Sequence, residues 1–363
     1  MMIDFTPREV NTIFPAGEGS KKRADAAGAS TIVGERHLSR SQDVMRVMKR
    51  TGKILVIRSG AIGDFIVTLP VIHLLRKTYS SWRLSLVAKN RLQPLVRNVV
   101  DEFADIDGPL LVPFFRDEVD RHCEEHRYLS KFDLVISYLG ERGKVSENLR
   151  ALGKPRVINA DALPPENYDR HITEFLLAPL TEVFDVSSPP LPTITIGKEE
   201  ANVAGEFLSK SGIAPSAPLV AIHPGSGSPR NVSPAGNFCR AINRIHSTFP
   251  DARLMVIEGE ADETFVHAFE RCLKMPCLKV RKDDLLDVAA ILSRASLFIG
   301  NDSGIAHLAA AVGVPTVVAF RASNPAVWSP KGKDVWVARD ASLQSIVERV
   351  AKKVVGSGDK RMA

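Results

Sequence analysis

The sequence KILVIRSGAIGD, residues 53–64, decides the fold class of this chain. Residues 53–57 contain a continuous apolar run with β-branched side chains, which is typical of a parallel strand buried on both faces. Gly60 and Gly63 then let the backbone turn sharply and leave room beside it for a ligand. The stretch therefore predicts a buried strand, a glycine loop and the start of a helix.

The same alternation recurs along the chain in two series, separated by a segment with three prolines at 187–192. The first series predicts strands over 53–57, 83–88, 133–137 and 156–159, a loop over 161–165, and helices over 69–78, 91–99 and 171–184. The second predicts strands over 219–223, 253–258, 297–300 and 316–320, and helices over 234–249, 263–273, 285–294, 305–312 and 343–355. We therefore predict an α/β protein with two doubly wound Rossmann-like domains facing a central cleft, with ligands at the carboxyl ends of the strands.

The pattern also sets the expected domain ranges. Residues 1–47 hold glycines, alanines and the cluster Lys21-Lys22-Arg23 without an apolar period, so we expect a disordered extension there. Translation starts at Met45 or Met48 are alternatives to the first methionine. The first domain is expected over 48–186, a linker region over 187–218, the second domain over 219–340, and a closing helix and tail over 341–363.

Composition limits the classes of protein to be considered. The chain has 363 residues, of which 44% are hydrophobic and 25% charged, values that exclude a mostly disordered protein. No stretch approaches the roughly 18 apolar residues of a membrane span, and the first 20 residues carry Asp4, Glu9 and Glu18, unlike a signal peptide. The sequence predicts a cytoplasmic protein.

The net charge of +6 does not indicate a nucleic-acid partner. Residues 1–50 hold nine Lys and Arg against six Asp and Glu, and the remaining 313 residues hold 39 against 36. Half of the excess lies in the first seventh of the chain, and the nearly neutral body argues against a dedicated nucleic-acid binder.

Four cysteines occur in the chain, at positions 123, 239, 272 and 277. They form no CxxC pair and have no histidines at zinc-binding spacing. Because the chain is long and no signal peptide is predicted, we expect free thiols in a reducing compartment. No metal site is predicted.

The glycine loop after the first strand ends in Asp64. Near a helix start, its carboxylate would be stabilised in the ionised form by the amide dipoles. A helix-capping role is the alternative. Dinucleotide binding is not indicated, because GxGxxG is absent and the second strand ends beside Lys89 rather than an acidic residue.

A second candidate loop, HPGSGSPRN at 223–231, follows the first strand of the second series. Small residues followed by Arg230 and a helix suit a phosphate or another anion, although no Walker pattern is present. An ordinary flexible loop is the alternative.

The third candidate loop, GNDSGIAHLAAA at 300–311, gives the strongest pattern of the three. Asp302 or Ser303 caps a short alanine-rich helix, and the lack of bulk at Ser303 and Gly304 lets a diphosphate approach its free amides. His307 lies one turn further on the same face. A structural histidine is the alternative reading for His307.

Taken together and in order, these motifs resemble glycosyltransferase family 9, the bacterial ADP-heptose:lipopolysaccharide heptosyltransferases. The matching pieces are ILVIRSGAIGD at 54–64 with Leu69-Pro70, HPGSG at 223–227 and DSGIAH at 302–307. The likeness spans roughly residues 50–355. It implies a GT-B fold and an inverting, metal-independent transfer of heptose from ADP-heptose to an inner-core sugar on a lipid, with no cofactor.

The resemblance also implies roles for single residues. Asp64 matches the proposed catalytic base, and the Asp302-Ser303-Gly304 turn with His307 matches contacts to the donor diphosphate and sugar. The loop from Glu258 and Gly259 to Glu263 lies where the family holds the adenosine ribose. The remaining expected donor contacts are Gly63, His223, Gly225, Ser226 and Asn231.

One departure from the family bears on the donor. The family often continues the second loop with a lysine, one residue and Trp-Pro, whereas this chain has Asn231-Val-Ser233-Pro234. Arg230 is therefore expected to take over the task of the lysine in catalysis. A transferase that uses another nucleotide sugar, or a non-catalytic paralogue that binds a sugar nucleotide, are the alternatives.

An anionic glycolipid acceptor would need cations in the first domain. Loops and helix ends there carry five candidate cations: Arg91, Arg97, Arg116, Arg142 and Lys144. A solvated surface is the alternative for these side chains. The lipid acceptor implies peripheral contact with the inner face of the cytoplasmic membrane.

Overall fold

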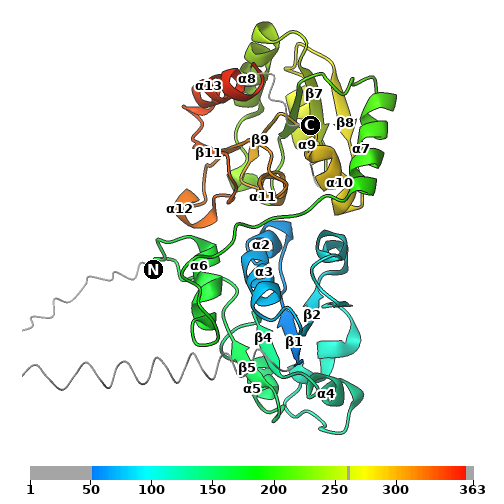
Figure 1. Ribbon diagram of the computed structural model, residues 1–363. Helices are drawn as coiled ribbons and strands as arrows, with labels where there is room; N and C mark the ends of the chain where they lie inside the picture. The colour runs from blue at the N-terminus through cyan, green and yellow to red at the C-terminus, as the bar shows by residue number, and fades with distance from the viewer. Residues whose placement is uncertain (1–50, 260–261, 357–363) are drawn as a thin grey trace, which may run out of the picture. The chain divides into compact units, whose positions relative to one another are not determined.

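The computed structural model describes residues 51–259 and 262–356. The disorder expected over 1–47, the start of the first domain at residue 48 and the end of the tail lie outside the described residues. The predicted α/β class is confirmed by two sheets with alternating helices (Figure 1).

Both sheets have a doubly wound strand order. The first runs β3-β2-β1-β4-β5 and the second β11-β10-β9-β6-β7-β8, with the strands paired in parallel. Each series thus begins at the centre of its sheet and reverses direction there. The strands are β1 Lys53–Ile57, β2 Arg83–Ala88, β3 Glu102–Asp105, β4 Leu134–Ser137, β5 Arg156–Asn159, β6 Leu219–His223, β7 Arg253–Ile257, β8 Cys277–Val280, β9 Leu297–Asn301, β10 Thr316–Ala319 and β11 Val335–Ala338.

Helices cover both faces of each sheet. The α-helices are α2 Ile62–Ile66, α3 Leu69–Thr78, α4 Glu124–Leu129, α5 Lys144–Arg150, α6 Ile172–Leu177, α7 Lys198–Lys210, α8 Ala235–Thr248, α9 Glu263–Glu270, α10 Leu285–Leu292, α11 Gly304–Ala311, α12 Pro325–Trp328 and α13 Leu343–Val354. The 3-10 helices are η1 Asn90–Val96, η2 Pro109–Phe115, η3 Ala178–Leu180 and η4 Pro229–Asn231. Helix α7 lies inside the range that the sequence suggested as a linker.

The alternating faces of β1 explain why its sequence is apolar throughout. Ile54 and Val56 join the hydrophobic cluster that contains α3, whereas Leu55 and Ile57 join the cluster of η2, α4 and α5. All four side chains are at most 1% exposed. Burial on both faces is what a central parallel strand requires.

Proline accounts for two differences from the expected helices. The helix predicted over 91–99 is the 3-10 helix η1, which contains Pro94. The single helix predicted over 171–184 is wrong: α6 ends at Leu177, and η3 follows with Pro179 in its first turn. Proline lacks the N–H that continues an α-helical ladder.

The expectation of four free thiols is wrong. Cys239 on α8 and Cys272, just after α9, form a disulfide with a Cα–Cα distance of 5.9 Å, while Cys123 and Cys277 are free. The two cysteines are 33 positions apart in the sequence, so spacing patterns such as CxxC do not reveal the pair. The packing of α9 beside α8 brings them together.

The two sheet domains contact each other through several side chains and loops. His171 Nε2, before α6, donates to the carbonyl oxygen of Ser329 after α12 (2.7 Å). Arg97 of the first domain forms an ion pair with Glu200 on α7. Of the helices that the structure describes, none is both long and apolar enough to cross a lipid bilayer.

Candidate active site

The motif loops lie at the two points where the strand order reverses. In the first sheet the glycine loop follows β1, beside β4; in the second, the 223–231 loop follows β6 and the 302–304 turn follows β9, its neighbour. Ligands of doubly wound folds bind at these positions, beyond the carboxyl ends of the strands.

Asp64 is fixed within the first loop by local backbone geometry. Gly60 has a φ of +123°, a conformation that side chains other than glycine rarely adopt, and a Cβ there would lie 2.7 Å from Asp64 Cβ. Ala61 N–H donates to Asp64 Oδ2 (2.9 Å). The glycine therefore makes room for a partly buried carboxylate held at one oxygen.

The buried side chain of Arg58 forms hydrogen bonds that hold the same loop. Its side chain is buried, and Nη2 donates to Asp64 O (3.2 Å) while Nε donates to Thr68 Oγ1 (3.0 Å). Thr68 Oγ1 in turn donates to Asp64 O (2.8 Å). Burial lowers the pKa of Arg58, and the charge of Asp64 opposes this effect. A buried guanidinium and a buried hydroxyl thus fix the backbone of Asp64.

A buried chain of three side chains lies at the start of α11. Ser303 is the N-cap residue, with its Oγ accepting from Ala306 N–H (3.4 Å). The same Oγ lies 3.1 Å from His223 Nδ1, and His223 Nε2 lies 2.8 Å from Asp262 Oδ2. His223 ends β6, whereas Asp262 and Ser303 stand immediately before α9 and α11, and each of the three side chains is less than 10% exposed.

Asp262 is one of the site residues that the sequence does not predict. Gly259 N–H also donates to its Oδ2 (2.8 Å), and a Cβ on Gly225 would overlap its Oδ1. Burial acts to raise the pKa of Asp262, but its hydrogen bonds with His223 and Gly259 and the charge of His223 hold that pKa below its usual value. The sequence predicts Glu258, Gly259 and Glu263 in this loop instead, because position within the loop carries no sign of which carboxylate points inward.

Asp302 connects the turn after β9 to the 223–231 loop and to Ser323, which follows β10. Its carboxylate accepts from Asn231 Nδ2 (3.2 Å) and from Ser323 Oγ, and its backbone oxygen accepts from Ser226 Oγ (2.6 Å). Burial raises the pKa of Asp302, and the bond from Ser323 opposes this. The structure thus brings together Asp302, Ser226 and Asn231, which are three of the expected donor contacts.

The candidate loops of the two domains meet at Gly63 and Gly304. A Cβ on Gly304 would lie 3.1 Å from Gly63 N, and a Cβ on Gly63 would lie 3.4 Å from His307 Cδ2. His307 is buried and bonds the backbone of Trp328; burial and the charge of His171 lower its pKa to about 4. Small residues therefore let the loop of Asp64 approach the start of α11.

Other predicted residues stand apart from this cluster. Arg230 is exposed on η4, and Glu263 is exposed at the start of α9. The hydrogen bond and charge of Glu270 raise the pKa of Lys279, and the charge of Glu258 adds to this effect. Among the expected acceptor cations, Arg91 and Arg142 are exposed, and Lys144 pairs with Asp117 (3.6 Å) and Glu147 (3.7 Å).

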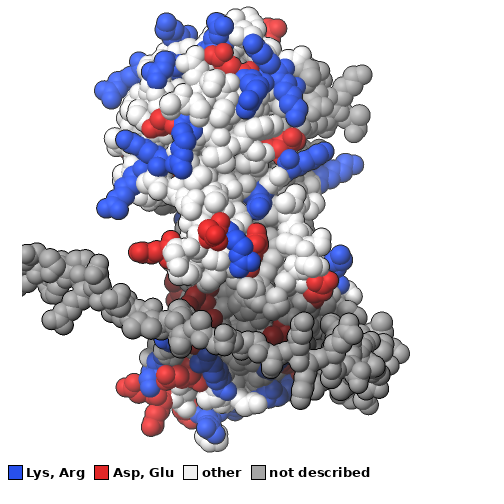
Figure 2. All heavy atoms as spheres, turned by 90° about the vertical axis from the view of Figure 1, so that its left-hand side faces the viewer, with Lys and Arg blue, Asp and Glu red and all other residues white. Residues whose placement is uncertain are grey.

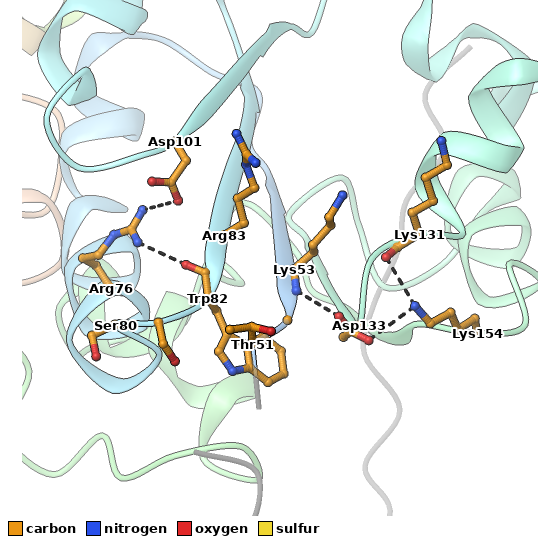
Figure 3. A pocket seen from close by; sticks show the side chains of 12 residues that line it. Thr51, Lys53, Arg76, Ser80, Trp82, Arg83, Asp101, Lys131, Asp133 and Lys154 are labelled. Atoms are coloured by element: carbon orange, nitrogen blue, oxygen red, sulfur yellow. Dashed lines mark hydrogen bonds and ion pairs between the residues drawn. The ribbon is translucent and has the colours of Figure 1, made fainter. Parts of the chain in front are cut away.

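A separate hollow of about 710 Å³ lies at the amino edge of the first sheet, opposite the glycine loop (Figure 3). Lysines and arginines line it, but both carboxylates on its wall are already bonded: Asp101 to Arg76, and Asp133 to Lys154 and the Lys53 backbone. Because ligands of doubly wound sheets bind at the opposite edge, we do not assign the reaction to this hollow.

Among the described residues, neither the surface charge nor the arrangement of metal-binding side chains identifies a second candidate site. On the face shown in Figure 2, Lys and Arg side chains lie in several separate groups, with Asp and Glu between some of them. Within residues 51–259 and 262–356, no group of three or more His, Cys, Asp or Glu side chains is arranged to hold a metal ion.

Comparisons with known proteins agree with this geometry. A family model described as glycosyltransferase family 9 (heptosyltransferase) matches residues 161–356, more than half of the chain. A comparison with curated protein sequences found no match.

Three solved structures share the fold at low identity. A glycosyl transferase family 9 protein from Veillonella parvula is 21% identical with a TM-score of 0.69, covering 85% of this chain and 97% of that one. ADP-heptose lps heptosyltransferase II of E. coli is 15% identical with a TM-score of 0.63, covering 84% and 98%. E. coli heptosyltransferase WaaC with ADP is 15% identical with a TM-score of 0.55, covering 84% and 99%. The fold is that of these GT-B proteins.

Proposed function

The chain belongs to glycosyltransferase family 9, the heptosyltransferase family, and is a glycosyltransferase. We propose that it transfers heptose from ADP-heptose to an inner-core sugar of a lipopolysaccharide precursor. The proposed transfer inverts the anomeric carbon and needs no metal. The acceptor is an anionic glycolipid, reached by peripheral contact at the inner face of the cytoplasmic membrane. The donor assignment is supported by the likeness to a heptosyltransferase solved with ADP.

One observation carries the proposal: the loop of Asp64 touches the amino end of α11, at Gly63 and Gly304. Inverting transfer needs a base for the acceptor hydroxyl and charge stabilisation for the leaving diphosphate on the other side of the sugar. The contact brings the loop of Asp64 to the amino end of α11, and helix amides at such an end suit a diphosphate.

The residues divide the reaction as follows. Asp64 takes the proton of the acceptor hydroxyl, whose oxygen then bonds to the anomeric carbon of heptose. The bond from that carbon to the diphosphate breaks, and ADP leaves with the electron pair. The amides at the start of α11, with Ser303 and Gly304, stabilise the developing charge. Arg91, Arg142 and Lys144 are the proposed acceptor contacts.

The substitution Asp64→Asn tests the base. It keeps the shape of the side chain and removes its basicity, so we expect turnover to fall about 10²–10⁴-fold while ADP binding is retained. The control is Asp251→Asn, an exposed aspartate in the turn before β7, which should leave turnover unchanged. Near-normal turnover by Asp64→Asn would contradict the assignment.

The absent lysine favours a second candidate, a transferase for another nucleotide sugar. Thermal-shift measurements with ADP, UDP, GDP and their sugars distinguish the two, because a bound ligand raises the melting temperature by mass action. Stabilisation by a uridine or guanosine diphosphate and none by ADP would favour the second candidate.

A further inference from the structure

The His223 side chain links an acidic residue to the N-cap of α11, and its hydrogen bonds limit where protons can lie. The carboxylate of Asp262 already accepts from Gly259 N–H and can only accept from His223 Nε2, which must therefore carry a hydrogen. His223 Nδ1 faces Ser303 Oγ at 3.1 Å. This contact can be made with the hydrogen on either atom.

The two arrangements differ in what Ser303 offers a ligand. If Nδ1 is unprotonated, the Ser303 hydroxyl donates to it and has no hydrogen left for a diphosphate. If Nδ1 carries a hydrogen, Ser303 Oγ accepts from both His223 and Ala306 N–H, and its own hydrogen can point to a phosphate oxygen. In the second arrangement His223 is an imidazolium paired with Asp262.

We propose that binding of the donor diphosphate is coupled to uptake of one proton by His223 Nδ1, so that an imidazolium held by Asp262 adds a positive charge beside Ser303 at the start of α11. The proposal rests on the donor site proposed above. The proton comes from solvent, and no other bond changes. The hydroxyl of Ser303 then donates to the ligand.

The surroundings of His223 favour this coupling. Asp262 is buried beside it, and burial strengthens the attraction between the two side chains. Of the other charged groups on the neighbouring loops, Asp302 is bonded to Asn231 and Ser323, Glu258 lies near Lys279, and Arg230 and Glu263 are exposed. His307, on α11, bonds the Trp328 backbone instead.

Calorimetry of ADP binding to the full chain at pH 8, in buffers with different ionisation enthalpies, measures the proton count directly. At this pH the terminal phosphate of ADP is already ionised, since its second pKa is about 6. We expect uptake approaching one proton per ADP bound by the unaltered chain, none by His223→Gln, and a smaller uptake by Asp262→Asn. The control His267→Gln, at an exposed position on α9, should keep the full uptake.

The outcomes separate this proposal from the assignment of the donor. ADP binding by the unaltered chain without proton uptake overturns the proposal and leaves the transferase in place. A purely structural role for His223 would weaken ADP binding in His223→Gln without any difference in proton count, and would also overturn it. If ADP, UDP and GDP all fail to bind, the donor site and the proposal fall together.

Discussion

At the scale of single residues, the support of Asp64 depends on a hydroxyl that the motif does not contain. Thr68 Oγ1 accepts from Arg58 Nε and donates to Asp64 O, and its side chain is fully buried. The residue stands four positions after Asp64, in the turn between α2 and α3. Its contribution is therefore to hold the loop, and a test must separate that from catalysis.

We predict that Thr68→Val lowers the free energy of unfolding by about 1–3 kcal/mol, because a buried Arg58 N–H loses its acceptor while the shape is kept. Turnover should fall as well, since the backbone of Asp64 is less firmly held. Urea unfolding and initial rates measure the two effects. The matched control, Thr181→Val at an exposed position, should change neither, and an equally stable, fully active Thr68→Val protein would refute the role.

Arg230, unlike Thr68, is exposed, and its expected role is to contact the donor directly. Helix amides offer about half a unit charge, so a leaving diphosphate needs a side-chain cation as well. We predict that Arg230→Ala lowers kcat more than it weakens donor binding, and that Asn231→Lys on that background restores part of kcat. Steady-state kinetics at varied donor concentration measure both constants. Equal kcat and KM values for Arg230→Ala and the unaltered enzyme would contradict the predicted role of Arg230.

Site residues were predictable where the sequence shows a strand followed by small residues. Gly60 and Gly304 mark close approaches that a larger side chain would block, and both stand in the quoted motifs. Asp262, Arg58 and Thr68 could not be found in this way. Their importance arises from contacts between loops, which no local pattern records.

At the scale of helices and strands, central strands were predictable and most edge strands were not. Sequence patterns missed β3, β8 and β11, each at an edge of its sheet, where the strands are half-exposed and lack a continuous apolar run. The edge strand β5 was found, through its Val157-Ile158 pair. Burial on both faces is what makes a central strand visible in the sequence.

The disulfide between α8 and the end of α9 gives a prediction at this scale. It closes a loop across 33 positions, for which the chain-entropy model gives a stabilisation of about 3–4 kcal/mol. We expect reduction, or Cys239→Ser with Cys272→Ser, to lower the melting temperature. Alkylation of the denatured, unreduced chain followed by mass spectrometry should label Cys123 and Cys277 and leave the other two unlabelled; labelling of all four would contradict the bond.

At the scale of the whole molecule, two histidines lie where the domains meet. Thr173 N–H donates to His171 Nδ1 (3.2 Å), so the ring hydrogen is on Nε2, which donates to Ser329 O across the domains. Burial, with the nearby charge of Lys331, lowers the pKa of His171 to about 4. His307, buried against the same turn, also has a pKa of about 4. Of these two backbone bonds, only that from His171 to Ser329 joins the domains, and burial favours the neutral form of both rings.

The sign of the pH dependence follows from these values. In the unfolded chain a histidine has a pKa of about 6.5, so between that pH and about 4 the unfolded state binds more protons than the folded state. The free energy of unfolding should therefore fall on acidification through this range, by about 2 kcal/mol for each histidine at pH 5. We predict that His171→Gln, whose amide can still donate to Ser329 O but does not titrate, loses less stability between pH 7 and pH 5 than the unaltered chain. Urea unfolding at both pH values measures the difference, and His122→Gln, at an exposed position, should behave like the unaltered chain. Equal losses in His171→Gln and the unaltered chain would show that the titration of His171 does not contribute to the loss of stability.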